Sequence, residues 1–328
     1  MGQRTDPSTT PSATPSARSL VQADRSLRFD PTLLAASTVA RTAGTAGRLL
    51  TLGLPGRLNR PIGGPVGWTP GVVDPADPPW CTPGGASWII HSDSASLIGG
   101  FMALWLQSLE PRTLAGVLEH SDFARDPRGR LQRTASFVGT TTFAPGTVAD
   151  EMCADVRRIH GFVRGTTPDG RPYSADDPRQ LDWVHCALMV GVSRAWLLYG
   201  QRPDPDLLDD YVAEQAAVPV ALGDPDPPRC YAELLDRVEE HRPNLAVNDQ
   251  TRWVGRWLAR PPFPGSLAVL APAYGVAYAA ALAAAPGWAR RLWGVTQPRW
   301  PGRLAGRTLA DSFTALTGTA GALEARVA

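Results

Sequence analysis

Three Asp-Pro dipeptides, at 126–127, 177–178 and 204–205, each precede a segment with helical periodicity of its apolar residues. Aspartate is a preferred N-cap residue, and proline fits the first position of a helix because that position needs no backbone N–H donor. Gly165 and Gly200 stand where two of the helices would end. This punctuation predicts a chain built from helices, and it constrains the fold more than any other feature of the sequence.

Helical periodicity continues along the chain, while the alternation typical of strands is nearly absent. At the start of the segment 148–164, Thr147 and Asp150 resemble a capping box, and Gly165 is expected to end the helix. We therefore predict an all-α fold with a single helical domain. The predicted helices span 95–109, 111–119, the segment after Asp126, 148–164, 178–199, the segment after Asp204, 231–240, 250–258, 266–285 and 303–316.

The N-terminal part of the chain differs in composition from the helical part. Residues 1–25 are rich in Ser, Thr and Pro and have few large apolar side chains, so we expect a disordered tail. Residues 26–90 contain many Gly and Pro residues and are expected to form an irregular extension that packs on the body. The helical domain is expected over 91–320.

Charge and cysteine content exclude several classes of function. The formal net charge of +1 offers no excess to attract nucleic acid or an anionic membrane. All 32 basic residues are arginine, so chemistry that needs a lysine amine is excluded. The four cysteines form no CxxC pair, which argues against a structural zinc site and favours a reducing compartment. We expect a cytoplasmic protein.

The segment 266–285 is apolar and about as long as a membrane-spanning helix. Its many alanines contribute little transfer free energy, and Pro272 interrupts the run. We therefore expect a buried helix here and regard a membrane span as the less favoured alternative.

His160 lies in the predicted helix 148–164, on the edge of an apolar stripe, and we expect it to be at least half buried. Arg157 and Arg164 lie three residues before and four after it, on the same side of a helix. Burial and neighbouring positive charge both lower the pKa of a histidine, so the imidazole should be neutral and able to bind a metal. From spacing alone, a core histidine bonded to a carbonyl is the stronger interpretation. The predicted stripe consists of Val148, Met152, Val156, Ile159 and Val163.

His185 lies in the predicted helix 178–199 in line with apolar residues, and it is expected to face the core in a structural role. Motifs for other sites are missing from the sequence: there is no HExxH, no Glu-x-x-His pair, no GxGxxG loop and no GxSxG elbow.

Arg130, Arg133 and Thr134 form a second group of interest on the helix that follows Asp126. Two arginines alone would indicate a solvated helix face. The nearby Phe137 and Phe143 favour partial burial of Thr134, and a hydroxyl beside cations could hold a bound oxygen species.

Four segments resemble the MpaB-type oxygenase family, which includes the latex clearing proteins, or rubber oxygenases. They are WLQSLEPRTLAGVLEHS (105–121), HSDFARDPRGRLQRT (120–134), VRRIHGFVRG (156–165) and PYSADDPRQLDWVH (172–185). The resemblance covers roughly 90–220 and keeps the order and spacing of the motifs. It implies a globin-like arrangement of helices around a b-type haem, and oxidative cleavage of a carbon–carbon double bond by dioxygen.

Carried over by position, His160 in RxxHxxxR matches the proximal iron ligand of the family, with Arg157 and Arg164 as the flanking arginines. Arg130 and Thr134 match the distal RxxKT pattern. His185 in WVH matches a recurrent histidine near the site, and we expect it to have a structural role or to contact a ligand of the iron without binding the iron itself. The chain departs from the family at Arg133, where the latex clearing proteins have a lysine. A guanidinium cannot lose its proton to ligate iron, so we expect the sixth coordination position to be vacant or water-bound.

The sequence therefore favours a haem b-dependent oxygenase that acts with dioxygen on an apolar, unsaturated small molecule. One alternative is a haem-dependent tailoring oxidase, dehydrogenase or hydroxylase that would need a redox partner. Another is a haem sensor or carrier without turnover, and a last one is a helical scaffold without a cofactor. Glu119 is a positional candidate for a catalytic base.

Overall fold

The computed structural model describes residues 14–27, 73–121, 126–260 and 271–317. The described chain is predominantly helical and contains one two-stranded antiparallel sheet, which confirms the predicted all-α class. The helices are α1 (Ala17–Ala23), α3 (Ala86–Ser92), α4 (Ala95–Gln107), α5 (Pro111–His120), α6 (Pro127–Phe143), α7 (Gly146–His160), α8 (Pro178–Tyr199), α9 (Leu207–Gln215), α10 (Ala217–Leu222), α11 (Tyr231–His241), α12 (Asp249–Ala259), α13 (Ala271–Ala284), α14 (Gly287–Trp293) and α15 (Arg299–Thr317). The short elements are the 3-10 turns η1 (Arg25–Leu27) and η2 (Arg242–Asn244) and the strands β1 (Arg164–Thr166) and β2 (Pro172–Ser174).

Two of the Asp-Pro signals act as predicted. The carboxylate of Asp126 accepts a hydrogen bond from the backbone N–H of Gly129 at 2.8 Å, and α6 begins at the next residue, a proline. Asp177 caps α8 in the same way, accepting from the N–H of Arg179 at 2.9 Å. At the third signal the helix α9 starts slightly later than predicted, with Asp206 as its N-cap residue.

The predicted bounds of α7 are wrong at both ends. The helix begins at Gly146, directly after Pro145, and the backbone N–H of Thr147 donates to Asp77 at 3.1 Å instead of taking part in a capping box. It ends at His160, because the following residues turn into the β1–β2 hairpin, in which Arg164 pairs with Ser174. Arg164 is therefore a strand residue.

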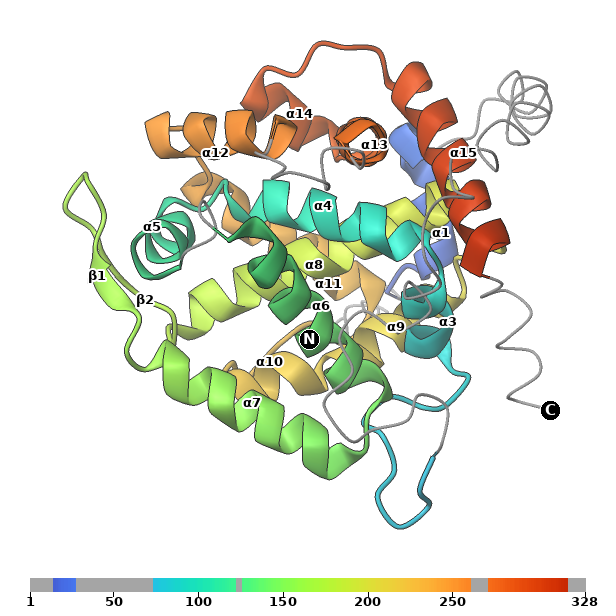
Figure 1. Cartoon of the computed structure of the whole chain (residues 1–328), viewed down its shortest axis with the longest axis horizontal. Helices are drawn as coiled ribbons and strands as arrows, with labels where there is room; N and C mark the ends of the chain where they lie inside the picture. Colours follow the sequence, from blue (N-terminus) through green and yellow to red (C-terminus); the bar gives the residue numbers. More distant parts are fainter. Residues whose placement is uncertain (1–13, 28–72, 122–125, 261–270, 318–328) are drawn as a thin grey trace, which may run out of the picture.

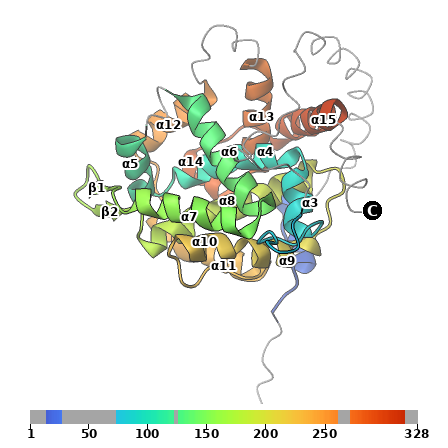
Figure 2. The same ribbon diagram turned by 60° about the horizontal axis from the view of Figure 1, so that its bottom comes forward.

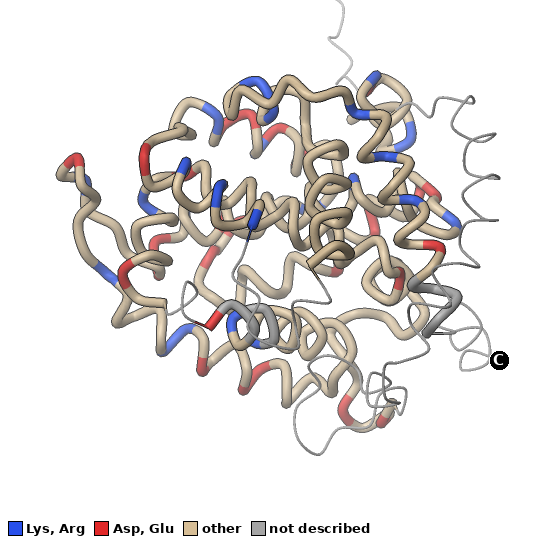
Figure 3. Tube along the Cα trace, turned by 45° about the horizontal axis from the view of Figure 1, so that its top comes forward, with Lys and Arg blue, Asp and Glu red and all other residues tan. Residues whose placement is uncertain are grey.

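The centre of the molecule is formed by α4 and α8, which cross at their glycines (Figure 1). A Cβ placed on Gly99 would lie 2.6 Å from the Cα of Val192, so the two backbones touch and only glycine fits. α12, α13 and α14 lie on one side of this pair, and α7 and α10 lie on the other (Figures 1 and 2). Acidic and basic positions are interspersed through the described chain, as Figure 3 shows.

Part of the predicted tail is ordered. α1 forms because the hydroxyl of Ser16 accepts from the N–H of Ser19, and Ala17 is only 1% exposed. Arg18 pairs with Asp206 at 2.6 Å, which ties the helix to the start of α9. Most of the predicted irregular extension, residues 28–72, lies outside the described residues.

Within the described residues, α8 is long and apolar enough to cross a membrane, and 83% of its apolar window is buried inside the fold. α3 and α4 pass the same test only as a pair bent by 90°. The predicted helix 266–285 appears as α13 over its described part. This helix has 14 residues and contains buried residues only from Ala277 onward, and it packs against α15.

Candidate functional site

His160 is the last residue of α7 and lies half buried. The inward face of the helix consists of Ala149, Cys153, Val156 and His160, at spacings of four, three and four residues. Ile159, predicted to belong to the buried stripe, is 52% exposed. The prediction placed His160 on the edge of the stripe, whereas the structure places it in line with the buried residues.

The His160 ring has a polar atom without a protein partner. Its Nδ1 is buried and makes no hydrogen bond within the described part of the chain. Burial lowers the pKa of the imidazole, while the carboxylate of Asp176 acts in the opposite direction. The lowered pKa favours the neutral imidazole, which can donate an electron pair to a metal.

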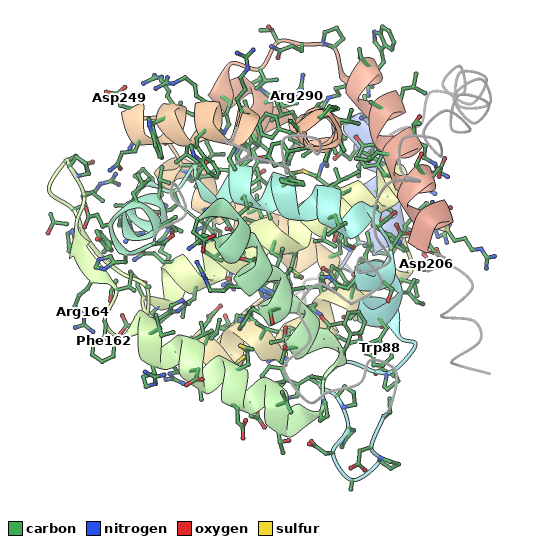
Figure 4. All side chains as sticks on the ribbon, viewed as in Figure 1. Trp88, Phe162, Arg164, Asp206, Asp249 and Arg290 are labelled. Atoms are coloured by element: carbon green, nitrogen blue, oxygen red, sulfur yellow. The ribbon has the colours of Figure 1, made fainter. Side chains whose placement is uncertain are left out.

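The two flanking arginines lie on different elements. Arg157 is exposed on α7, and its guanidinium approaches Gly223 at the end of α10, where a Cβ would lie 3.7 Å from the Cζ atom. Arg164 is exposed on β1 and lies 3.7 Å from Asp176. Figure 4 shows Arg164 and its neighbour Phe162 pointing away from the body of the molecule. Both side chains are thus exposed, but they are not aligned on one helix.

His185 lies in the second turn of α8, only 7% exposed. Its Nε2 is also buried without a hydrogen-bond partner in the described chain. Burial lowers its pKa to about 4, against the opposing effect of Asp182. The β1–β2 hairpin connects the end of α7, at His160, to the start of α8, the helix that carries His185 (Figure 1).

The predicted distal group lies in the first turns of α6. Arg130 is partly buried, and its Nη1 donates to Ser121 Oγ at 3.0 Å. Burial lowers the pKa of Arg130, and the charge of Arg133 lowers it further. Arg133 is exposed and lies 3.6 Å from Asp126. Thr134 is exposed as well, so its predicted burial is wrong; its hydroxyl donates to the carbonyl of Arg130 at 3.1 Å.

A second polar cluster ties α5 to the hairpin. The hydroxyl of Tyr173 on β2 donates to the carboxylate of Glu119 and lies 3.1 Å from His120 Nε2. A Cβ on Gly165 would lie 2.5 Å from this hydroxyl, so the glycine allows β1 to approach it. Glu119, the positional candidate for a base, is thus bound to a tyrosine. Sequence reasoning missed the tyrosine because nothing in the local pattern marks it.

Several more buried polar atoms have no hydrogen-bond partner among the described residues, and sequence reasoning missed them. Three of them lie on α3 and at the end of α6, where the run of three threonines at 140–142 was the only visible signal. These three atoms are Trp88 Nε1, Thr140 Oγ1 and Thr142 Oγ1.

The described residues contain no group of three or more His, Cys, Asp or Glu side chains that could hold a metal ion. His160 and His185 nevertheless each offer a neutral ring with an unused buried nitrogen. A metal bound by one of them would need most of its ligands from a source other than these side chains.

The comparisons with known proteins agree with the resemblance of the motifs. Residues 88–321 match the family model described as "ER-bound oxygenase mpaB/B'/Rubber oxygenase, catalytic domain". Searches of curated proteins and of solved structures found no significant match. The matched residues contain both histidines and all the arginines discussed above, and they cover more than two thirds of the chain. The chain therefore belongs to the mpaB/rubber oxygenase family, and it is an oxygenase, an enzyme of the oxidoreductase class.

Proposed function

We propose that this oxygenase binds haem b through His160 and cleaves a carbon–carbon double bond of an apolar, unsaturated small molecule with dioxygen. The observation that carries the proposal is the buried, unpartnered Nδ1 of His160, placed within the RxxHxxxR pattern of an oxygenase family domain. A buried polar atom without a partner is costly, and ligation would remove that cost.

The residues present fit a haem. A porphyrin supplies four nitrogen ligands, so a single imidazole is sufficient, and the described chain offers no larger donor cluster. Arg157 and Arg164 are exposed and lie within four residues of His160 in the sequence, and they can form charge-assisted hydrogen bonds with the two propionates. When bound, the haem supplies a redox-active iron for the reaction with dioxygen.

The polypeptide positions and polarises the reactants. Arg130 is held by Ser121, and its partly buried guanidinium can stabilise developing negative charge on oxygen. Arg133 adds a second cation and cannot act as an iron ligand. The hydroxyl of Thr134 already donates to the carbonyl of Arg130, so its oxygen can accept a hydrogen bond from a bound group. His185 supports the site from α8, where its burial keeps the ring neutral.

The proposal also places the protein in the cytoplasm, because its four cysteines are free thiols. No nucleic acid partner is proposed, since the net charge is only +1.

The test is the haem content of the full-length protein expressed with added haem. We expect a Soret band in the wild-type protein and its loss in His160→Ala, with helix content unchanged by circular dichroism. His185→Leu is the matched control, because it removes the other neutral, unpartnered imidazole, and it should keep the haem. Loss of haem in His185→Leu but not in His160→Ala would overturn the ligand assignment, and a colourless wild-type protein would overturn the proposal.

Turnover is tested separately with an oxygen electrode and a long-chain alkene. Oxygen consumption without an added reductase agrees with cleavage, since dioxygen cleavage needs no external electrons. A strict need for a reductase would indicate a haem-dependent hydroxylase, and the absence of consumption would indicate a sensor or carrier.

A further inference from the structure

Two buried polar atoms lie where α3 packs against the end of α6, and neither has a hydrogen-bond partner within the described residues. They are Trp88 Nε1 and Thr140 Oγ1, and the exposed fractions of these residues are 9% and 0%. Buried polar groups in folded proteins are almost always partnered, so such a group needs an explanation.

Trp88 and Thr140 share one side of this contact. The ring of Trp88 meets Phe143 edge-on, with centroids 5.2 Å apart. Thr140 lies one helical turn before Phe143, on the same face of α6. Figure 4 shows Trp88 on the side of α3 that faces α6. The indole N–H and the threonine hydroxyl therefore border the same part of the interior.

The surrounding polar groups are satisfied. The carboxylate of Glu214 accepts from the backbone N–H groups of Ser87 at 2.8 Å and Thr82 at 3.3 Å. The side-chain amide of Gln215 donates to Cys81 at 3.4 Å. Loose packing of the whole corner thus does not explain why Trp88 Nε1 and Thr140 Oγ1 have no partner.

The position of Thr140 connects this corner to the proposed site. Thr140 follows Arg133 by seven residues on α6, which is two turns on the same face and about 10.5 Å along the helix. A molecule whose reacting carbon lies beside Arg133 can therefore reach Thr140 with a part that is several bonds away.

The donors select the chemistry of the bound group. An indole N–H can only donate a hydrogen bond, and a hydroxyl can donate as well, so their common partner is an oxygen acceptor. The carboxylate of Glu214, bound to the backbone of Ser87, disfavours an anionic group nearby. A neutral carbonyl or hydroxyl oxygen fits both conditions.

We propose that Trp88 Nε1 and Thr140 Oγ1 bind a neutral oxygen function of the substrate, a carbonyl or a hydroxyl, so that the substrate is an oxygen-bearing alkene and not a pure hydrocarbon. This inference rests on the proposed function for the reaction at the double bond. The polar binding site itself needs no haem.

The test compares two probes of the same chain length and double-bond position: an unbranched eleven-carbon alkene and the corresponding methyl ketone. Binding to the full-length protein is measured by ligand-observed NMR. We expect the ketone to bind roughly five- to tenfold more tightly than the hydrocarbon, as one net hydrogen bond allows. Equal binding of the two probes to the wild-type protein would overturn the proposal.

Thr140→Val removes the hydroxyl and keeps the shape, while Trp88→Phe removes the indole N–H together with one ring, and in each variant the preference for the ketone should fall below that of the wild-type protein. Thr141→Val is the matched control, because the hydroxyl of this buried neighbour already donates to the carbonyl of Phe137 at 3.0 Å. It should keep the preference. If Trp88→Phe does not fold, Thr140→Val carries the test alone. A preference retained in Thr140→Val would mean that its hydroxyl binds internal water only, and the proposal would fall.

The same titration with His160→Ala separates this inference from the proposed function. We expect the preference for the ketone to persist in this haem-free variant. If the wild-type protein contains haem but shows no preference for the ketone, only the proposal of a polar binding site is overturned. If the wild-type protein contains no haem but shows the preference, only the haem assignment is overturned.

Discussion

Asp24 and Arg194 form an ion pair in which carboxylate Oδ2 and guanidinium Nη1 lie 2.6 Å apart, although the residues are 170 positions apart in the sequence. The side chain of Arg194 is 5% exposed, and it also donates to Ser26 at 2.6 Å and to the carbonyl of Ala284 at 2.8 Å. The N-terminal segment thereby supplies the counter-charge for a buried cation of α8.

Asp24→Asn should lower the free energy of unfolding at pH 7 by about 1–2 kcal/mol, because it leaves the buried guanidinium without its charge partner. Burial alone would raise the pKa of Asp24, but Arg194 and Ser26 outweigh it and the pKa is lowered. The contribution is therefore complete above the ordinary aspartate pKa and is lost as the pH falls through the lowered folded-state value. Urea unfolding of both proteins at pH 7 and at several values below pH 4 measures this.

The control for Asp24→Asn is Asp206→Asn, which breaks the exposed pair with Arg18. We expect no measurable change, since exposed ion pairs contribute little. An equal loss of stability in the two variants would contradict the role assigned to the buried arginine.

Gly99→Ala and Gly100→Ala should change stability in opposite directions. A methyl group on Gly99 would lie 2.6 Å from the Cα of Val192, and neither backbone can move without separating α4 from α8. We expect a loss of about 1–3 kcal/mol, larger than the gain in helix propensity. Gly100 has no heavy atom within 4 Å of the same position, so its alanine variant should gain about 0.5–1 kcal/mol. Thermal unfolding of the two variants gives the sign directly, and a stabilised Gly99→Ala would contradict the observed helix crossing.

The fold was predictable where local chemistry sets it. Asp126 and Asp177 bond their own helices, so their positions in the sequence determine where α6 and α8 begin. The end of α7 was not predictable, because the chain after His160 leaves the helix to pair Gly165 with Tyr173, a contact between separate segments. Tertiary pairing here overrides a glycine that looked like a helix stop.

The candidate site was predictable in part for the same reason. His160 is marked by its spacing along one helix and by its motif, and its burial follows from that spacing. Thr134 was expected to be buried because phenylalanine lies nearby in sequence, but burial depends on which elements pack against α6. Trp88 and Thr140 come from helices that are more than 30 positions apart, so only the packing of α3 on α6 brings them together.

His185→Leu should make the protein less sensitive to acid. The pKa of His185 is lowered to about 4, below the ordinary histidine value of about 6.5, so the unfolded chain binds a proton first as the pH falls. The wild-type protein should therefore lose stability between pH 6.5 and 4, and the variant should lose less in this window. Near pH 7 the substitution should be close to neutral, because leucine also removes the unpartnered Nε2. Urea midpoints measured from pH 4 to 7 test this, and parallel pH profiles of the two proteins would contradict it.

Arg133→Lys should change the resting haem spectrum under the proposed function. The side chain of Arg133 is 65% exposed and lies 3.6 Å from Asp126, a contact too weak to hold a lysine in its place. A lysine amine can lose its proton and ligate iron, whereas a guanidinium cannot. We expect the wild-type spectrum of a vacant or water-bound sixth position to change, as the pH rises, to that of a six-coordinate haem with nitrogen ligands on both faces. Oxygen consumption should fall in parallel, because the same position must stay open for the reaction.

Arg133→Gln is the control, since it removes the charge without adding an amine, and its spectrum should stay like that of the wild type. An Arg133→Lys spectrum that does not change up to alkaline pH would place this residue away from the iron and would assign the distal role to Arg130 and Thr134 alone.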